Sequence, residues 1–158
     1  IVKTLWLTMA RVSELVTLDV ADVKPDEGQA KIRGGKGGKD RLIVLPRELA
    51  QELASYIGHR RRGPLFVSRH RRRFTARRIQ QIVNAARRAA RIDRKVSPHT
   101  LRRSMATELL NRGVREEAVS TLLGHASTET TRIAYARLTI QTLRDEVEQA
   151  LRAPRGGA

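Results

Sequence analysis

His99 and Arg102 have the residue types and the spacing for phosphate chemistry. They follow Ser97-Pro98, a pair that predicts a helix start. Residues three apart on a helix share one face. In the first turn, unpaired backbone N–H groups and the helix dipole also favour an anion. An imidazole and a guanidinium placed there could bind a phosphate. Taken alone, however, the pair fits a helix start with polar side chains facing solvent at least as well.

A second candidate group lies further along the chain, where Leu123-Gly124-His125 precedes Tyr135 by ten residues. A histidine just past a helix end is often only a cap, and a tyrosine is more often a packing residue than a nucleophile. The only other tyrosine, Tyr56, falls in an ordinary amphipathic segment. The combination of Leu-Gly-His, a Ser/Thr-rich turn and then Tyr is highly specific, and it favours a chemical role for both residues.

A glycine-rich segment supplies two lysines that could act on a phosphate, Lys36 and Lys39, within Gly34-Gly35-Lys36-Gly37-Gly38-Lys39. The β-prone runs 29–33 and 41–45 flank it, so the pattern predicts a hairpin with a glycine-rich tip. A nucleotide-phosphate loop is rejected, because the Gly-x-x-x-x-Gly-Lys-Ser/Thr order is missing and no helix follows. A lysine in such a tip is usually solvated, and spacing alone does not choose between the two.

The charge points to a polyanionic partner. Lysine and arginine total 32 against 16 aspartate and glutamate, which gives a net charge of +16 and a pI near 11.6. Nucleic acid is the commonest partner of such a chain. Aromatic residues make up only 3% of the sequence, which disfavours single-strand stacking platforms. Duplex DNA held by its phosphates is therefore the better expectation.

Other classes are disfavoured by composition. The absence of cysteine excludes disulfides and thiolate metal sites, and it fits a reducing, intracellular compartment. No apolar run approaches the roughly 20 residues that span a bilayer. No segment joins a basic face to a broad aromatic face, as a membrane-surface helix would. We expect no membrane partner.

The patterning predicts an α+β fold, mainly helical with one small antiparallel hairpin. The segment 12–23 has helical spacing, and 65–68 could be a short buried strand. Thr75 should cap a helix over 76–91 and Ser97 one over 99–111. Further helices are expected over 47–57, 116–123, 130–138 and 139–151, with a flexible tail at 152–158.

Together these motifs resemble those of the tyrosine recombinases, the phage integrase and Xer-type family. The resemblance rests on four motifs in the family's order, spanning nearly the whole chain: Arg11-Val12-Ser13-Glu14-Leu15, the hairpin from Gly35 to Arg41, Ser97 to Arg103, and Leu123-Gly124-His125 with Tyr135. Any one of them is weak alone. In a chain of charge +16, the ordered set is a strong indication.

The resemblance implies the role of each site residue. Tyr135 would attack a DNA phosphodiester to leave a covalent 3′-phosphotyrosine, and His99 would serve in proton transfer. Arg11 and Arg102 would hold the non-bridging oxygens, and His125 would hydrogen-bond near the phosphate. The family pattern places the catalytic lysine at Lys36 rather than Lys39. It implies no metal, cofactor or ATP. Glu14 would cap or orient its neighbours.

The resemblance also implies an assembly. Residues 1–151 would form the catalytic domain, without the family's N-terminal core-binding domain, in a cytoplasmic protein of bacterial, archaeal or phage origin. Four protomers would act on two double-stranded DNA sites. Helix 139–151 could dock onto a neighbour, or it could pack against its own domain. We expect DNA-backbone contacts from seven basic residues, although a charged soluble surface explains any one of them equally well: Lys39, Arg41, Arg71, Arg72, Arg73, Arg77 and Arg78.

Two departures from the family pattern are visible. Met9-Ala10 stands where Gly-Leu is usual before the first arginine, a change we expect a helix to tolerate. The interval from His125 to Tyr135 is one residue longer than usual. Two other functions stay open at this point, a non-catalytic DNA-binding module and a type IB topoisomerase-like nicking and closing enzyme. A covalent protein–DNA adduct would separate the first of these from an enzyme.

Overall fold

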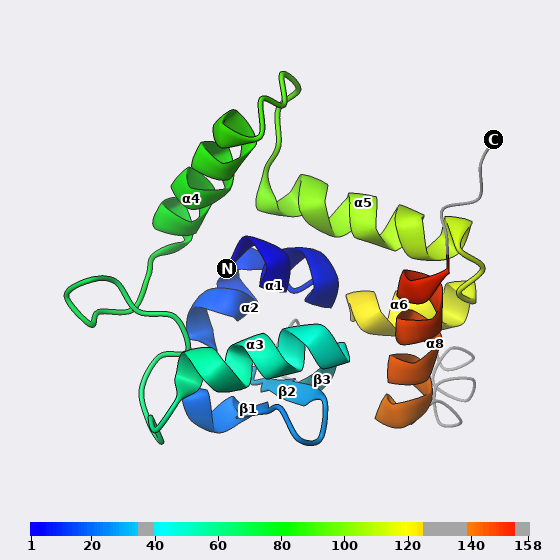
Figure 1. Ribbon diagram of the computed structural model, residues 1–158, viewed down its shortest axis with the longest axis horizontal. Coiled ribbons are helices and arrows are strands. Elements are labelled where there is room, and N and C mark those ends of the chain that lie inside the picture. The colour runs from blue at the N-terminus through cyan, green and yellow to red at the C-terminus, as the bar shows by residue number, and fades with distance from the viewer. Residues whose placement is uncertain (35–39, 125–138, 154–158) are drawn as a thin grey trace.

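The protein is mainly helical with one small sheet, as the sequence predicted. The computed structural model describes residues 1–34, 40–124 and 139–153, and Figure 1 shows the arrangement. In chain order the elements are α1 (Val2–Thr8), α2 (Val12–Thr17), the 3-10 turn η1 (Val20–Asp22), β1 (Val23–Lys24), β2 (Gln29–Ile32), β3 (Arg41–Val44), α3 (Arg47–Ile57), α4 (Ala76–Ala89), α5 (Pro98–Asn111), α6 (Glu116–Leu123) and α8 (Ile140–Arg152).

The predicted hairpin is present, and it belongs to a three-stranded antiparallel sheet in the order β1-β2-β3. In the β2–β3 ladder Ile32 pairs with Arg41 and Ala30 with Ile43. The register therefore puts Arg41 at the start of β3, two residues before the buried Ile43. Side chains two apart on a strand share a face, so Arg41 is directed toward the core side of the sheet.

The expected single helix over 12–23 was wrong. It divides into α2, η1 and the short strand β1. Leu18 adopts an extended backbone after α2, and the carboxylate of Asp22 then accepts a hydrogen bond from the backbone N–H of Asp19 at 3.1 Å. Local side-chain bonding of this kind competes with helix propagation. Strand β1 has only two residues, too few for an alternation pattern to show in the sequence.

The expected strand over 65–68 was also wrong. Its apolar residues are buried, with Leu65 fully enclosed and Phe66 nearly so. The only ladder contacts nearby, among the residues described, are isolated bridges from Asp19 to Pro64 and from Val67 to Arg73. A short apolar run signals burial, not a particular backbone geometry.

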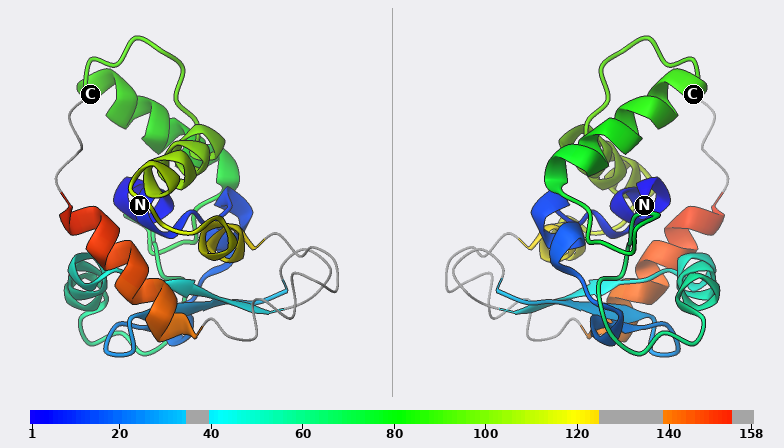
Figure 2. Two further views of the ribbon diagram at one scale, coloured as in Figure 1. Left: turned by 90° about the vertical axis from the view of Figure 1, so that its right-hand side faces the viewer. Right: turned by 90° about the vertical axis from the view of Figure 1, so that its left-hand side faces the viewer.

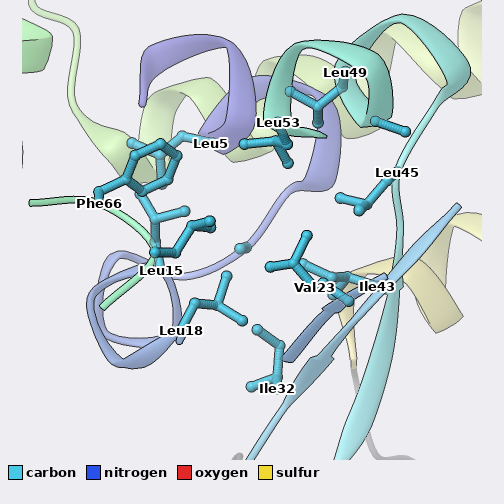
Figure 3. Packing of buried hydrophobic residues seen from close by; sticks show 14 of the residues in the cluster. Leu5, Leu15, Leu18, Val23, Ile32, Ile43, Leu45, Leu49, Leu53 and Phe66 are labelled. Carbon is cyan, nitrogen blue, oxygen red and sulfur yellow. The ribbon is translucent and has the colours of Figure 1, made fainter. Parts of the chain in front are cut away.

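Two apolar clusters form the core. The first joins α1, α2, the sheet, α3 and α4 around Leu5, Leu15, Ile32 and Ile43, as Figure 3 shows. The second joins α5, α6 and α8 around residues such as Leu109. Helix α1 lies between α5 and α3, so its C-terminal end meets the boundary between the clusters.

Helix caps at α4, α5 and α6 follow the sequence signals. The hydroxyls of Thr75 and Ser97 accept hydrogen bonds from backbone N–H groups in their first turns, and Pro98 opens α5. Gly124 ends α6 in the left-handed conformation, with φ of 61°, which glycine adopts without strain. The start of α5 fixes the position of Arg102 on that helix, and Gly124 fixes where α6 ends, one residue before His125. The helix expected over 130–138 lies outside the described residues.

Helix α8 packs against its own domain in this structure. Leu143, Val147 and Ala150 are buried in the second cluster, and Glu148 accepts a hydrogen bond from the backbone N–H of Arg47 at 2.9 Å. The two views of Figure 2 place α8 beside α3 and the sheet. Of the two arrangements left open by the sequence, the structure shows the one within a single chain.

This packing predicts that Leu143→Ala will lower the free energy of unfolding by about 2–5 kcal/mol, the usual cost of truncating a buried leucine. Urea unfolding followed by circular dichroism measures it. The matched control is Gln149→Ala, an exposed position on the same helix. Equal stability of both variants would show that α8 is not packed on its own domain in solution.

Candidate active site

Glu14 is the buried acid around which the candidate site is built. It lies in the first turn of α2 with its side chain 7% exposed. Its carboxylate accepts the backbone N–H of Arg11 at 2.7 Å and the Arg11 guanidinium at 2.9 Å. This is the acidic half of a capping box, favoured also by the helix dipole. The sequence prediction that Glu14 caps and orients its neighbours is confirmed.

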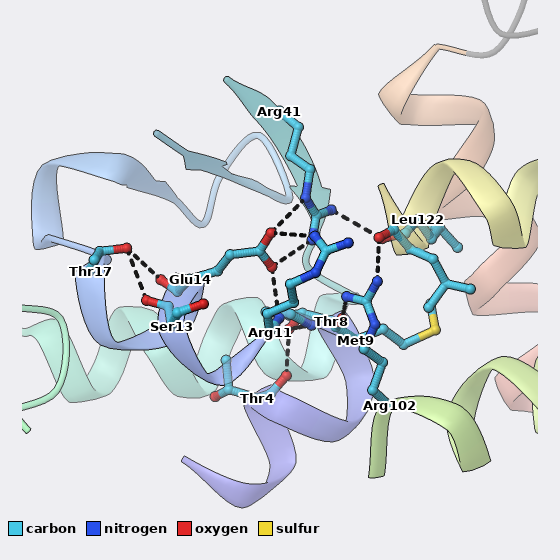
Figure 4. Close-up of polar contacts among 12 residues, drawn as sticks. Thr4, Thr8, Met9, Arg11, Ser13, Glu14, Thr17, Arg41, Arg102 and Leu122 are labelled. Carbon is cyan, nitrogen blue, oxygen red and sulfur yellow. Dashed lines mark hydrogen bonds and ion pairs between the residues drawn. The ribbon is translucent and has the colours of Figure 1, made fainter. Parts of the chain in front are cut away.

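Arg41 reaches the same carboxylate from the sheet. Its Nη2 lies 2.9 Å and its Nε 3.3 Å from the two Glu14 oxygens, and its Nη1 donates to the carbonyl of Leu122 at 3.1 Å. The side chain is only 15% exposed. Figure 4 shows Arg11 and Arg41 converging on Glu14. Arg41 is therefore mostly buried and bonded within the protein, which the sequence did not predict.

Arg102 approaches from α5 and is almost fully buried. Its guanidinium donates to the carbonyl of Met9, next to the Arg11 segment, and to the carbonyl of Leu123 at the end of α6. Met9 caps α1 in the left-handed conformation with φ of 51°. The expectation that Met9-Ala10 would be tolerated because it lies on a helix was wrong, since this position favours glycine.

The three guanidinium groups leave the site with surplus positive charge. Burial alone would raise the pKa of Glu14, but hydrogen bonds from Arg41 and Arg11 outweigh it and lower the pKa. Burial, followed by the positive charges of Arg11 and Arg41, lowers the pKa of Arg102 to about 10. Arg102 thus stays charged at neutral pH, and a bound anion would relieve the repulsion among the three.

His99 lies one turn before Arg102 on α5 but faces outward. It is exposed and borders a groove on the outer face of α5 with Thr100, Arg103 and Ser104. The structure thus places Arg11 and Arg102 in one cluster and His99 at the surface of the same helix start. Lys36, Lys39, His125 and Tyr135 lie outside the described residues.

The remaining arginines expected on DNA fall into two kinds. Arg73 ties its loop to the protein, because its guanidinium donates to the carbonyls of Val16 and Leu18 at 2.7 and 3.2 Å and pairs with Asp19. The others are exposed as well, and the side chains of three of them have no hydrogen bond or ion pair with any residue that the structure describes: Arg71, Arg72 and Arg77. Arg78 contacts Gln81 at 3.1 Å on its own helix.

Two further properties concern the described residues only. No cluster of three or more His, Cys, Asp or Glu side chains there is placed to hold a metal ion. None of the described helices is both long enough and apolar enough to cross a membrane.

Sequence reasoning missed the contacts that Arg41 makes with Glu14 and with the carbonyl of Leu122. The available signal was strand alternation: Arg41, Ile43 and Leu45 share one face, and an arginine on a face otherwise apolar points to a buried partner. That partner, Glu14, is 27 residues away in the chain, so its identity depends on the tertiary fold.

The sequence matches the model of the phage integrase family over residues 1–142. It is similar to tyrosine recombinase XerA of Pyrococcus furiosus, with 41% identity over 155 residues, covering 95% of this chain and 53% of that protein. The fold is similar to the crystal structure of XerA recombinase, with a TM-score of 0.73 and 36% identity, covering 96% of this chain and 56% of that one.

A XerH site-specific recombinase bound to palindromic difH substrate, in a post-cleavage complex, is also similar. The TM-score is 0.65 and the identity 26%, over 91% of this chain and 42% of that one. The chain therefore spans about half the length of the relatives that it matches.

The buried Glu14 carboxylate makes stability depend on pH in a defined direction. Because its pKa is lowered on folding, its contribution is present above the unfolded-state pKa, near 4.3, and is lost as the pH falls below that value through the folded-state pKa. We expect Glu14→Gln to be less stable than the wild type at pH 7 and to lose less free energy of unfolding between pH 7 and 3. Urea titrations at each pH measure this, and identical pH dependence in the two proteins would contradict it.

Proposed function

Because this chain belongs to the phage integrase family of tyrosine recombinases, we propose that it is the catalytic domain of a site-specific DNA recombinase. It cleaves one DNA strand by forming a covalent 3′-phosphotyrosine and rejoins it without metal or ATP. The domain comprises residues 1–151. Relatives of this chain named as recombinases, and one bound to its DNA substrate, support the proposal.

One observation carries the proposal: Arg11 and Arg41 bond the single carboxylate of Glu14, and the buried guanidinium of Arg102 lies close enough for the charges of all three to act on it. Arg11 and Arg102 each keep N–H groups beyond those used in the contacts described. Arg11 is a third exposed and joined to Glu14 through one terminal nitrogen, so its remaining donors are available to a phosphate. Arg102 supplies a desolvated charge beside it. Such preplaced donors stabilise charge that develops in a transition state.

The proposed reaction conserves the phosphodiester. The phenol oxygen of Tyr135 attacks the phosphorus, the bond to the 5′ oxygen breaks, and the phenol proton passes to a base, for which His99 is the family's candidate. Lys36 delivers a proton to the departing 5′ oxygen. Arg11 and Arg102 hold the non-bridging oxygens, and His125 hydrogen-bonds near the phosphate. A 5′ hydroxyl then reverses the steps, which is why no ATP is consumed.

The partner is double-stranded DNA, and four protomers acting on two sites is the proposed assembly. Docking of the C-terminal helix onto a neighbour would require Leu143, Val147 and Ala150 to leave the second core cluster. The cost of exposing this apolar face favours an assembly in which most of α8 stays on its own domain.

The test of function is covalent capture. The protein is incubated with a pool of nicked suicide duplexes with randomised arms, in which the short fragment released by cleavage diffuses away. We expect a protein–DNA adduct that survives denaturation and is absent in Tyr135→Phe. Arg11→Ala should slow its formation by about 100–1000-fold. A protein that binds the duplexes without forming an adduct would instead be a non-catalytic DNA-binding module.

The two kinds of arginine give a second prediction. Arg72→Ala should weaken duplex binding and reduce the slope of log affinity against log salt by about 1, because one phosphate contact is lost. Arg73→Ala should leave that slope unchanged and lower the free energy of unfolding by about 1–3 kcal/mol, because its bonds are internal. Fluorescence anisotropy at several salt concentrations and urea unfolding measure both. A reversed pattern would overturn the assignment.

A further inference from the structure

We propose that Arg41 is a positioning residue of this site, linking the Arg11 segment to the end of α6 that leads to His125. The proposal rests on the proposed recombinase function for its catalytic consequence. Its structural part stands on the contacts of Arg41 alone.

Arg41 joins two parts of the protein that have no apolar core in common. Glu14 lies on α2 next to Leu15, which belongs to the first cluster. Leu122, on α6, belongs to the second. Arg41 bonds the Glu14 carboxylate with two nitrogens and the Leu122 carbonyl with the third. A planar guanidinium can satisfy acceptors on two sides at fixed angles, whereas a lysine ammonium cannot reproduce this geometry.

The fit of Arg41 against the end of α6 is close. A Cβ atom built on Gly124 would lie 2.8 Å from both Cδ and Nε of Arg41. Gly124 thus has two reasons to be glycine, its positive φ and the approach of this side chain. The Arg41 side chain therefore lies against the last residue of α6 that the structure describes, and His125 follows this residue in the sequence.

Arg41 also starts the strand that follows the glycine-rich tip with Lys36. One side chain therefore contacts or adjoins three segments that carry proposed catalytic residues: the start of α2, the end of α6 and the hairpin. Arg102 makes a parallel link, from Met9 to Leu123. Arg102 is expected on the substrate phosphate, whereas all three side-chain nitrogens of Arg41 already donate to protein acceptors.

The alternative role is a direct phosphate contact, as the sequence suggested. The two roles predict different effects of the same variants. A phosphate contact requires charge, so Arg41→Lys would preserve it. A positioning role requires the planar guanidinium, so Arg41→Lys would form the covalent adduct slowly. Binding to uncleaved duplex would not change when the guanidinium is replaced.

The first experiment compares Arg41→Met, Arg41→Lys and the control Arg47→Met, an exposed arginine at the start of α3 that is outside the site. We expect both Arg41 variants to form the covalent adduct about 100-fold more slowly, the scale on which a misplacement of about 1 Å acts. Duplex affinity and its salt slope should stay within twofold of the wild type, as should the rate of adduct formation by Arg47→Met. Loss of affinity with a smaller salt slope, rescued by Arg41→Lys, would overturn the proposal.

The second experiment does not depend on catalysis. Hydrogen exchange should show amide protons at the end of α6, residues 119–124, exchanging about tenfold faster in Arg41→Met, with those of α8 unchanged. Gly124→Ala should have the same effect in the wild type and a smaller one in Arg41→Met, where the added methyl group meets no guanidinium. Unchanged exchange in folded Arg41→Met would refute the link. If the wild type formed no adduct while exchange changed as expected, only the proposed function would fail.

Discussion

The site depends on one constraint: the carboxylate of Glu14 is buried against Arg11 and Arg41, with the charge of Arg102 nearby. Removing a carboxylate from water is costly unless charge and hydrogen bonds compensate for it. Here Arg11 supplies its backbone N–H and guanidinium, and Arg41 supplies two further donors. Because the compensation comes from α2 and β3 together, the start of the helix and the strand are fixed relative to each other. Arg41 also donates to the carbonyl of Leu122, so α6 is held against the same pair of residues.

Local signals predicted the parts of the fold that local chemistry determines. Ser97-Pro98 and Thr75 cap helices as expected, and the glycine-flanked runs form the hairpin. Where tertiary contacts decide, the sequence was insufficient. The break after α2 depends on the bond from Asp19 to Asp22. The inward direction of Arg41 was implied by strand alternation, but its partners come from α2 and α6. The resemblance supplied the residues of the site; the structure supplied the geometry of Arg11 and Arg102.

Two features at the site depart from ordinary local preferences. Met9 holds a left-handed backbone normally given to glycine, and Arg102 is buried with its pKa lowered to about 10. The two are in contact, since the Met9 carbonyl accepts from Arg102. Departures of this kind persist where surrounding contacts enforce them, and they gather at functional sites. The surplus of arginine has likewise two uses, with Arg41 and Arg73 holding the structure and Arg72 and Arg77 left exposed.

In the proposed reaction this arginine cluster serves attack on DNA by one particular tyrosine, Tyr135. The most direct measurement is mass spectrometry of the protein–DNA adduct after nuclease and protease digestion. We expect a nucleotide remnant joined through a 3′ phosphate to Tyr135, formed by the wild type and strongly reduced in Arg11→Ala. A remnant on Tyr56, or a protein that binds duplex DNA and carries no remnant at all, would contradict it.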